Sequence, residues 1–358
     1  MIKYFLNKTF YALLTLFGVI TVIFFLFNVL PGDPAQMMLG QNEDSEQLAL
    51  VKQKYGFNKP ISTQYLYYLN DLSPISFHSG NQNDYTYLST NKYTATTLFT
   101  IGKTTTVIKF PYLRESFTKQ GKKVSQILGE TLPNTFVLAV SAIVIAIFIG
   151  ILLGIVSALK KDTFLDKAIQ IFSTIGMAVP SFFSAILFAW LFGYVLHKYT
   201  NLEMTGSLYQ LDDFGEHYFI QWKNLILPAI VLGVRPLAVV IQLMRNSLLE
   251  VFNQDYIRTA RAKGLSEYQI IKKHAVKNAL NPVVTAISGW FASMLAGAVF
   301  VEYIFGWNGL GKEIVNALNT LDLPVIMGAV LVIATLFVMI NIFVDIIYTW
   351  LDPKVTLE

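Results

Sequence analysis

This chain of 358 residues contains no cysteine and few charged residues, only 14% of the total. The absence of cysteine excludes disulfides that could staple an exported loop, and it excludes metal and redox sites built on cysteine. The low charge accompanies 54% hydrophobic residues, whereas a typical soluble domain has about 25% charged residues. The composition therefore argues against an ordinary soluble protein and favours a membrane protein.

Signatures of catalysis are missing as well. The run Gly306–Lys312 nearly completes a P-loop, but Glu313 stands where Ser or Thr must hold Mg²⁺. Basic residues follow one membrane face instead of forming a nucleic-acid groove. The four histidines are His78, His197, His217 and His274. They lack the spacing of a zinc site, and no Ser/His/Asp arrangement is suggested. We expect no enzymatic activity, metal site, cofactor or nucleic-acid partner for this chain.

Long apolar runs dominate what the chain does contain. About 20 apolar residues in a helix cross the hydrocarbon core of a bilayer. The first run is longer than the apolar core of a signal peptide, so we expect it to be retained. The runs predict an all-α polytopic membrane protein with six transmembrane helices: Thr9–Leu30, Thr135–Leu159, Ala168–Leu196 with a break at Pro180, Asn224–Met244, Pro282–Val301 and Pro324–Val344. In the second, Gly150 and Gly154 are expected to allow close helix packing.

The distribution of Lys and Arg predicts the orientation of these spans. With a cytoplasmic N-terminus, the short outside loops hold only three basic residues (Lys198, Lys223 and Lys312). The inside segments hold many more (Lys3, Lys8, Lys160, Lys161, Lys167, Arg245, Arg258, Arg261, Lys263, Lys272, Lys273, Lys277 and Lys354). This bias follows the positive-inside rule. Both termini are therefore expected in the cytoplasm.

The spans divide the chain into three regions. Residues 1–30 form the N-terminus and first span, 31–130 an external region, and 131–358 a core with five spans. Within the external region, Ser45–Leu72 has a helical pattern, and Thr94–Phe110 alternates Thr with apolar residues around a Gly102-Lys103 turn. We therefore expect a small α/β insertion whose β-containing cap covers about 73–114.

A basic segment at 246–280 interrupts the core between the fourth and fifth spans. Apolar residues near every fourth position predict one helix up to Gly264, because glycine commonly ends helices. Ser266 and Gln269 then form a capping-box pattern that starts a second helix. Small residues at the turn favour docking of a partner protein, whose surface could approach the backbone closely. The alternative is an amphipathic helix on anionic lipid.

The turn of this segment carries a family resemblance. Arg258-Thr-Ala-Arg-Ala-Lys-Gly264 resembles the coupling-helix motif of ABC importer permeases, in the form found in oligopeptide/dipeptide-type permeases. Arg258 and Thr259 replace the acidic residue and first alanine of the general motif. Other stretches resemble the B-type permease of that group: Leu30–Pro34, Lys54–Pro60, Gln64–Tyr67, Leu132–Thr135, Glu302–Gly306, Gly309–Gly311, Asp322–Pro324, Asp345 and Leu351–Pro353. The resemblance covers 1–72 and 115–358; residues 73–114 are longer than the usual loop.

The resemblance implies a permease subunit that forms half of a pathway for di- or oligopeptides. Implied partners are a homologous C-type permease, two cytoplasmic ATPases that bind ATP and Mg, an external substrate-binding protein and the lipid bilayer. The implied location is the bacterial plasma membrane, and the implied mechanism is alternating access. The residues implied in coupling to the ATPases are Arg258, Thr259, Ala260, Arg261, Ala262, Lys263 and Gly264.

Two charged residues near the spans are candidates for the pathway. Arg235 lies about eleven residues into the fourth span, where a charge facing lipid is costly. It is expected either to line a water-filled pathway or to pair with an acid such as Glu302. Glu302 closes the fifth span at its outer end. An ordinarily solvated boundary position is expected for Glu302, with pathway lining as the alternative.

Three other functions remain open from the sequence. A metal-chelate importer of the nickel type shares the same branch of permeases. A proton-driven secondary transporter would need acidic residues at mid-membrane and inverted repeats, whereas Arg235 is the mid-span charge observed here. A membrane scaffold that only recruits partners would show no transport. Uptake into proteoliposomes with and without ATP separates ATP-driven import from the last two.

Overall fold

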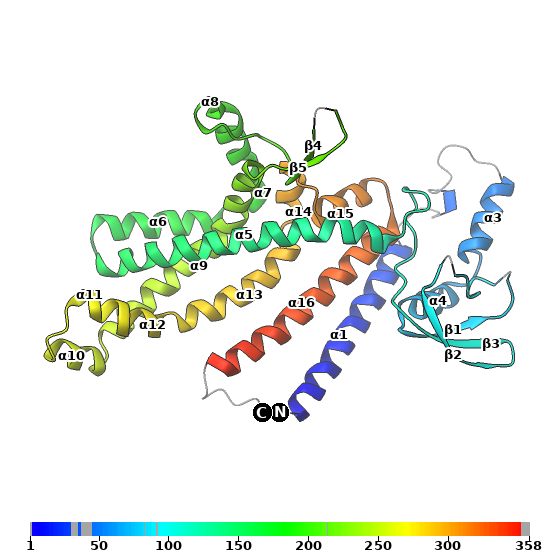
Figure 1. Cartoon of the computed structure of the whole chain (residues 1–358), viewed down its shortest axis with the longest axis horizontal. Helices are drawn as coiled ribbons and strands as arrows, with labels where there is room; N and C mark the ends of the chain where they lie inside the picture. The colour runs from blue at the N-terminus through cyan, green and yellow to red at the C-terminus, as the bar shows by residue number, and fades with distance from the viewer. Residues whose placement is uncertain are drawn as a thin grey trace. The chain divides into compact units, whose positions relative to one another are not determined.

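A computed structural model describes residues 2–29, 35–36, 45–82, 84–90, 92–212 and 214–351. The motif at 30–34 and residues 352–358, which include Lys354, lie outside these ranges. The chain falls into two compact units. We call one the helical unit, mainly Thr131–Glu313, and the other the mixed unit, Thr9–Glu130 with Ile314–Ala334. Helices predominate, as predicted (Figure 1).

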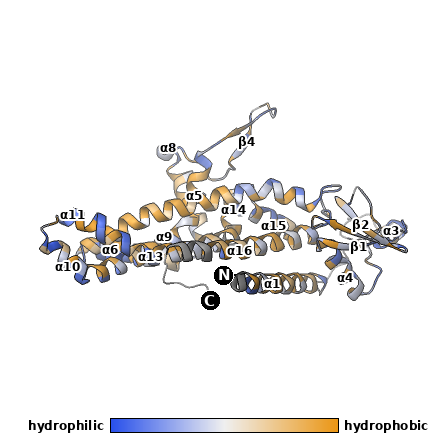
Figure 2. Ribbon diagram, turned by 60° about the horizontal axis from the view of Figure 1, so that its bottom comes forward, coloured by the Kyte–Doolittle hydropathy of each residue, from blue (hydrophilic) through white to orange (hydrophobic). Residues whose placement is uncertain are grey.

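Four helices are each long and apolar enough to cross a membrane: α1 (Ile2–Val29), α5 (Val124–Leu159), α9 (Lys223–Phe252) and α16 (Leu323–Leu351). Two bent pairs meet the same condition when taken together. They are α6 (Phe164–Ala178) with α7 (Ser181–Phe188) and the π-helical η1 (Ala189–Val195), and α13 (Asn281–Gly297) with α14 (Val299–Phe305). The six predicted spans are recovered when each bent pair counts as one. Figure 2 shows hydrophobic residues along α5 and α13.

The break at Pro180 is confirmed, but it is much larger than a kink. The axes of α6 and α7 differ by 109°. Val179 adopts extended backbone, because a residue before proline is disfavoured in the helical region. Helix α6 also begins earlier than predicted, at Phe164, where the Thr163 side chain accepts the Asp166 N–H and caps it. The third predicted span is therefore two helices, which the apolar pattern alone did not distinguish from one.

Glycines bring α5 and α9 into close contact in the helical unit. A Cβ added at Gly150 would lie 2.7 Å from Val240 Cγ1, and one at Gly154 would lie 2.7 Å from Met244 Cβ. The packing role expected for this glycine pair is confirmed. Helix α9 is longer than the predicted span and continues to Phe252. Its C-terminal end, buried at Leu248, supports the segment that follows.

The rest of the helical unit comprises short elements that the sequence did not predict. They are α8 (His197–Thr200), the hairpin β4 (Tyr209–Leu211) and β5 (Tyr218–Ile220), and α15 (Leu310–Asn319), whose last residues belong to the mixed unit.

The mixed unit contains an α/β domain, residues 45–117. Its helices are α3 (Ser45–Tyr55) and α4 (Ile61–Leu72). Its antiparallel sheet has the order β1-β3-β2, with β1 (Ile75–Ser79), β2 (Ala95–Ile101) and β3 (Thr104–Lys109). Gly102 has φ +59° in the turn between β2 and β3, where an L-residue would be strained. The predicted small sheet and its turn are confirmed.

A buried carboxylate organises the interior of the α/β domain. Asp71 is 0% exposed. It accepts hydrogen bonds from Tyr85 Oη at 2.6 Å, Tyr93 Oη at 2.8 Å and Arg114 Nε at 3.0 Å. The Lys109 amine donates to the backbone oxygen of the same residue. A buried charge is tolerated when it is paired and fully hydrogen-bonded, so this network joins α4, the loop before β2, β3 and residue 114 without any disulfide.

Candidate functional site

The basic segment between α9 and α13 consists of two helical arms joined by a tight turn. The first arm is α10 (Asp255–Ala262). The turn passes through Gly264, with φ +76°. The second arm is α11 (Glu267–Ile270), the π-helical η2 (Ile271–Ala275) and α12 (Val276–Ala279). The predicted capping box is present. The Ser266 hydroxyl accepts the backbone N–H of Gln269, and the Gln269 side-chain oxygen accepts the backbone N–H of Ser266.

One side of this segment is packed onto the chain's own helices. Ile257, Ala260 and Ile270 are buried in a cluster with Leu248 of α9 and Ala158 of α5. A partner protein therefore cannot reach Ala260 directly, although the sequence grouped it with the other residues of the turn. The sequence pattern correctly marked a helix with an apolar stripe, but the stripe faces inward.

The other side of the segment is exposed. Six of the seven residues implied in coupling lie there (Arg258, Thr259, Arg261, Ala262, Lys263 and Gly264). Arg261 Nε donates to Glu267 Oε1 at 2.8 Å across the turn, and this contact lowers the pKa of Glu267. Figure 2 shows hydrophilic residues at α10 and α11. The turn is thus polar and exposed, and the buried residues Ile257 and Ile270 hold it against α5 and α9.

An ion pair joins the first turn of α6 to the C-terminal half of α9. Arg245 donates from Nε to Asp166 Oδ1 at 2.8 Å and from Nη2 to Oδ2 at 2.7 Å. Ser157 of α5 also donates to Asp166. The Asp166 side chain is 3% exposed and the Arg245 side chain 18%. The bidentate pair therefore ties three helices together, and no local sequence motif announced it.

Arg235 is exposed on α9 and makes one long contact. Its Nη2 lies 3.5 Å from the backbone oxygen of Met177, at the C-terminal end of α6. Among the residues that the structure describes, no carboxylate is within ion-pair distance of it. The pairing with Glu302 considered from the sequence is not observed. Its guanidinium thus remains available for another anion or carbonyl.

Glu302 is not a solvated boundary residue, so that expectation is wrong. Its side chain is 0% exposed. Oε2 accepts the N–H groups of Gly311 at 2.6 Å and Lys312 at 3.2 Å. Within the described ranges, Oε1 has no hydrogen-bond partner. A Cβ added at Gly309 would lie 2.5 Å from this carboxyl group, so the Gly309-Leu-Gly311 motif leaves room for it.

The same loop is hydrogen-bonded to α5 at Asn134 and Thr135. Trp307 is fully buried, and its Nε1 donates to the Asn134 backbone oxygen at 3.0 Å. Asn134 Nδ2 donates to the Asn308 backbone oxygen at 2.8 Å, and Leu310 N donates to Thr135 Oγ1 at 2.7 Å. Motifs that lie more than 160 residues apart in the sequence thus meet in one place. We call residues 302–312 with 134–135 the glutamate loop.

Comparisons with known proteins cover most of the chain. The family model described as "Binding-protein-dependent transport system inner membrane component" matches residues 150–357. The model for the N-terminal part of such membrane components matches residues 1–83.

Several curated relatives are similar over nearly the full length. The dipeptide transport system permease protein DppB of Alkalihalophilus pseudofirmus is 33% identical over 368 residues, which cover 99% of each chain. The di/tripeptide permease protein DppB of Pseudomonas aeruginosa is 32% identical, with 95% of each chain covered. The Bacillus subtilis DppB is 31% identical and covers 100% of this chain and 99% of its own. A chain of the MetNI methionine ABC transporter, solved facing inward, has a TM-score of 0.49 and 16% identity, covering 64% of this chain and 97% of its own.

Proposed function

Because this chain belongs to the family of binding-protein-dependent transport system inner membrane components, we propose that it forms half of the translocation pathway of an ATP-driven peptide importer. As a member of that family, it is a multi-pass inner-membrane permease subunit without catalysis of its own, and it works with ATPase and substrate-binding partners. The cargo, the composition of the complex, the orientation of the termini and the residues that couple to ATP hydrolysis are proposed here.

The exposed turn at Arg258–Gly264 carries this function. Its side chains are exposed on one side, while Ile257 and Ile270 anchor the segment to α5 and α9 on the other. A partner that moves the turn therefore moves α9 as well, because the buried contacts leave no slack between them. This geometry suits the transfer of motion from an ATPase to the membrane helices. A segment that only lay on lipid would need its apolar stripe facing the membrane, but here that stripe is used internally.

We place two ATPase subunits on the cytoplasmic side, each against a coupling segment. One segment belongs to this chain and the other to a homologous permease. The N- and C-termini then lie in the cytoplasm, and the α/β domain lies outside with the substrate-binding protein. The excess of Lys and Arg in the segments assigned to the inside supports this orientation. ATP binding would draw the two coupling segments together and open the pathway to the outside.

Short peptides are the proposed cargo. The three DppB relatives are named as dipeptide or di/tripeptide permeases, and this chain is similar to each of them over almost its whole length. Their names support peptides, rather than nickel chelates, as the cargo. Arg235 is consistent with this cargo, because a guanidinium without a carboxylate partner can bind a peptide carboxylate or carbonyl.

Reconstitution with the partner subunits tests this function. The complete complex in proteoliposomes should import a labelled dipeptide only when ATP and the binding protein are both present. Uptake driven by a proton gradient without ATP would contradict ATP-driven import. Uptake of nickel chelates with no uptake of peptides would contradict the cargo alone.

A further inference from the structure

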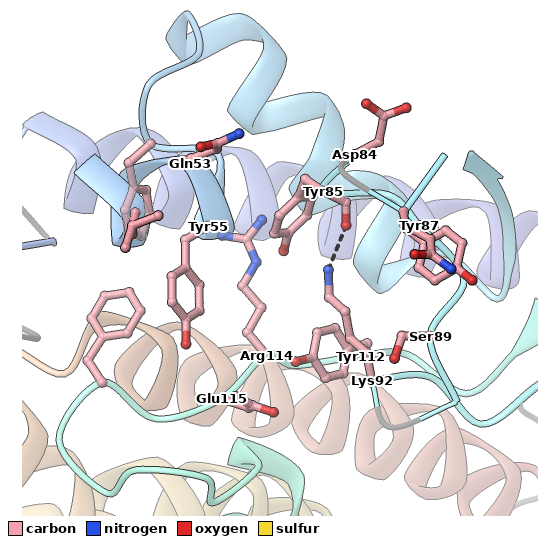
Figure 3. Close-up of a pocket in the computed structure, with 14 residues that line it drawn as sticks. Gln53, Tyr55, Asp84, Tyr85, Tyr87, Ser89, Lys92, Tyr112, Arg114 and Glu115 are labelled. Atoms are coloured by element: carbon pink, nitrogen blue, oxygen red, sulfur yellow. Dashed lines mark hydrogen bonds between the residues drawn. The ribbon is translucent and has the colours of Figure 1, made fainter. Parts of the chain in front are cut away.

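The α/β domain encloses a cavity of about 630 Å³. Figure 3 shows that aromatic rings and charged side chains converge on it. All of its lining residues lie between positions 50 and 117, so the cavity is contained within this domain. Cavities that bind small molecules have volumes of roughly 300–1,000 Å³ and combine apolar walls with a few polar groups. This cavity therefore has the size and lining of a ligand site, although none of the coupling or pathway residues lines it.

Two cations face the cavity with hydrogen-bond donors to spare. Lys92 Nζ donates to the Tyr85 backbone oxygen at 3.0 Å and lies 3.5 Å from the centroid of the Tyr85 ring. Arg114 uses its Nε for Asp71 at 3.0 Å. An ammonium has three N–H donors and a guanidinium five. Within the described part of the chain, Lys92 has no carboxylate partner and the Nη groups of Arg114 have no acceptor.

Three positive and three negative side chains lie in and around this cavity, but they do not all pair with one another. Asp71 is the carboxylate that Arg114 contacts, and Asp84 accepts a hydrogen bond from Ser79 Oγ at 2.6 Å. Among the described residues, neither Lys92 nor Glu115 has an ion-pair partner of its own. Burial lowers the pKa of Lys92 and of Lys109, each to about 8. A charge that is partly removed from water without a direct partner is unfavourable, so Lys92 and Glu115 are each better satisfied when a ligand brings a group of opposite charge. Rigidity alone does not require this arrangement, because an uncharged side chain could fill the space of Lys92.

The remaining lining defines the rest of the ligand. Tyr55 and Phe57 stack with their ring centroids 5.8 Å apart, and Phe117 meets both rings edge-on. These rings offer an apolar wall to a side chain. Glu115 lines the same cavity, and no described residue donates a hydrogen bond to its carboxylate. A ligand that complements all three features has a carboxylate, an ammonium group and an apolar side chain.

We propose that this cavity is a binding site for short peptides, in which Arg114 and Lys92 hold the C-terminal carboxylate, Glu115 holds the N-terminal ammonium, and the aromatic wall holds a side chain. The identification of the ligand as a peptide rests on the proposed function. The permease would then bind its cargo class on its own α/β domain, separately from the substrate-binding protein and from the membrane pathway.

Binding of defined dipeptides to the purified full-length chain, without partner subunits, tests this site. Isothermal titration should show binding of Ala-Phe. Its C-terminal amide should bind about tenfold more weakly or worse, because hydrogen bonds to a charged group are lost. N-acetylation should also weaken binding. These comparisons use the unaltered protein, so they do not depend on the folding of a variant.

Matched variants locate the site. Lys92→Met should weaken Ala-Phe binding about tenfold or more, and Lys92→Arg should restore it. Lys103→Met makes the same change at an exposed position in the β2–β3 turn and should bind as the unaltered chain does. Equal binding of Ala-Phe and its amide, undiminished binding by Lys92→Met, or equal competition by inorganic phosphate would overturn the assignment.

The reconstituted complex separates this inference from the proposed function. If the complex imports peptides but the isolated chain does not bind Ala-Phe, the cavity is not a peptide site and the transport function stands. If the isolated chain binds Ala-Phe with the expected preferences but the complex imports no peptide, the cavity assignment stands and the transport function fails.

Discussion

The carboxylate of Glu302 accepts the backbone N–H of Gly311 at 2.6 Å. The space around Gly311 is too small for any side chain. A Cβ at this position would lie 2.4 Å from Val299 Cα. The contact closes the glutamate loop onto α14 and holds Trp307 in the interior. This contact between Glu302 of α14 and Gly311 of α15 thereby holds the two helices close together.

We predict that Gly311→Ala destabilises the chain by about 1–3 kcal/mol, because the added methyl overpacks a site that cannot expand. Thermal unfolding of the detergent-purified chain measures the loss. Gly289→Ala is the matched control in α13, where nothing lies within 4 Å of the added Cβ. A fall in midpoint for Gly289→Ala as large as that for Gly311→Ala would show that the loss is unrelated to the contact with α14.

Asp166→Asn should destabilise the helical unit by about 3 kcal/mol, since it leaves the largely buried Arg245 without its charge partner. Glu250→Gln is the control, because Glu250 is exposed near the end of α9 and its substitution makes the same loss of one negative charge. Removing both partners with Asp166→Asn and Arg245→Met should recover part of the stability. Additive losses in the double variant, measured by thermal unfolding, would mean that the two residues do not act as a pair.

Ala262→Trp should abolish peptide-stimulated ATP hydrolysis by the reconstituted complex without lowering the thermal stability of the permease. The residue is exposed on the turn at Arg258–Gly264, so a bulky side chain there disturbs only the surface that we propose docks an ATPase. Thr96→Trp, exposed on β2 of the α/β domain, is the control and should leave hydrolysis unchanged. Normal stimulation in Ala262→Trp would remove this turn from the coupling surface.

Arg235 should face the translocation pathway, because lipid exposure at mid-span would cost about 2.5 kcal/mol or more. Arg235→Met is expected to reduce uptake while the amount of protein in the membrane stays the same. A cysteine at this position should react with a water-soluble thiol reagent, and the chain has no other cysteine to confuse the readout. Failure to react in both the resting and the ATP-bound complex would exclude it from the pathway.

Binding of N-acetyl-Ala-Phe to the α/β domain should be nearly constant from about pH 5 to about pH 7, where the peptide carboxylate is ionised, and weaken as the pH rises through about 8. Burial lowers the pKa of Lys92 to about 8 in the free protein, and a bound carboxylate raises it because it favours the charged amine. Affinity is therefore lost as the pH rises through the free-state pKa. Acetylation removes the peptide's own amino group, which titrates in the same range.

Other groups around Lys92 must be separated from it. Burial also lowers the pKa of Lys109 to about 8 and raises the pKa of Tyr85, Tyr93 and Tyr112, which stay neutral. Asp71, Asp84, Arg114 and Glu115 are the remaining charged neighbours, and burial lowers the pKa of nearby His78. Lys92→Arg keeps its charge above pH 8, so it should remove most of the alkaline loss. An unchanged profile in that variant would assign the titration to Lys109.

The sequence predicted the features that arise from local patterns. Apolar length located the spans, Pro180 marked a helix break, and Ser266 with Gln269 marked a helix start. The burial of Glu302 could not be predicted in this way. A glutamate at the end of an apolar run is ordinarily solvated, and its burial depends on backbone N–H groups in a loop that folds back over it. Asp71 and the Asp166–Arg245 pair depend on similarly distant partners.

The inward-facing stripe of the coupling segment has the same explanation. Ile257 and Ala260 lie at helical spacing with the residues before them, which predicts an apolar face but does not specify what covers it. The cover comes from α5 and from the C-terminal half of α9. The direction of the 109° turn at Pro180 is also set by tertiary packing, because proline ends a helix without choosing the path of the next.

The unbroken length of α9 gives this subunit a mechanical property. Its 30 residues make a rod about 45 Å long, anchored at its inner end to the coupling segment. If the rod tilts by about 10° around its middle, each end sweeps about 4 Å, while the middle hardly moves. Arg235 lies near that middle, next to Pro236. A residue at this position stays almost still when α9 tilts, so the Arg235 side chain would keep its place while the two ends of the helix move.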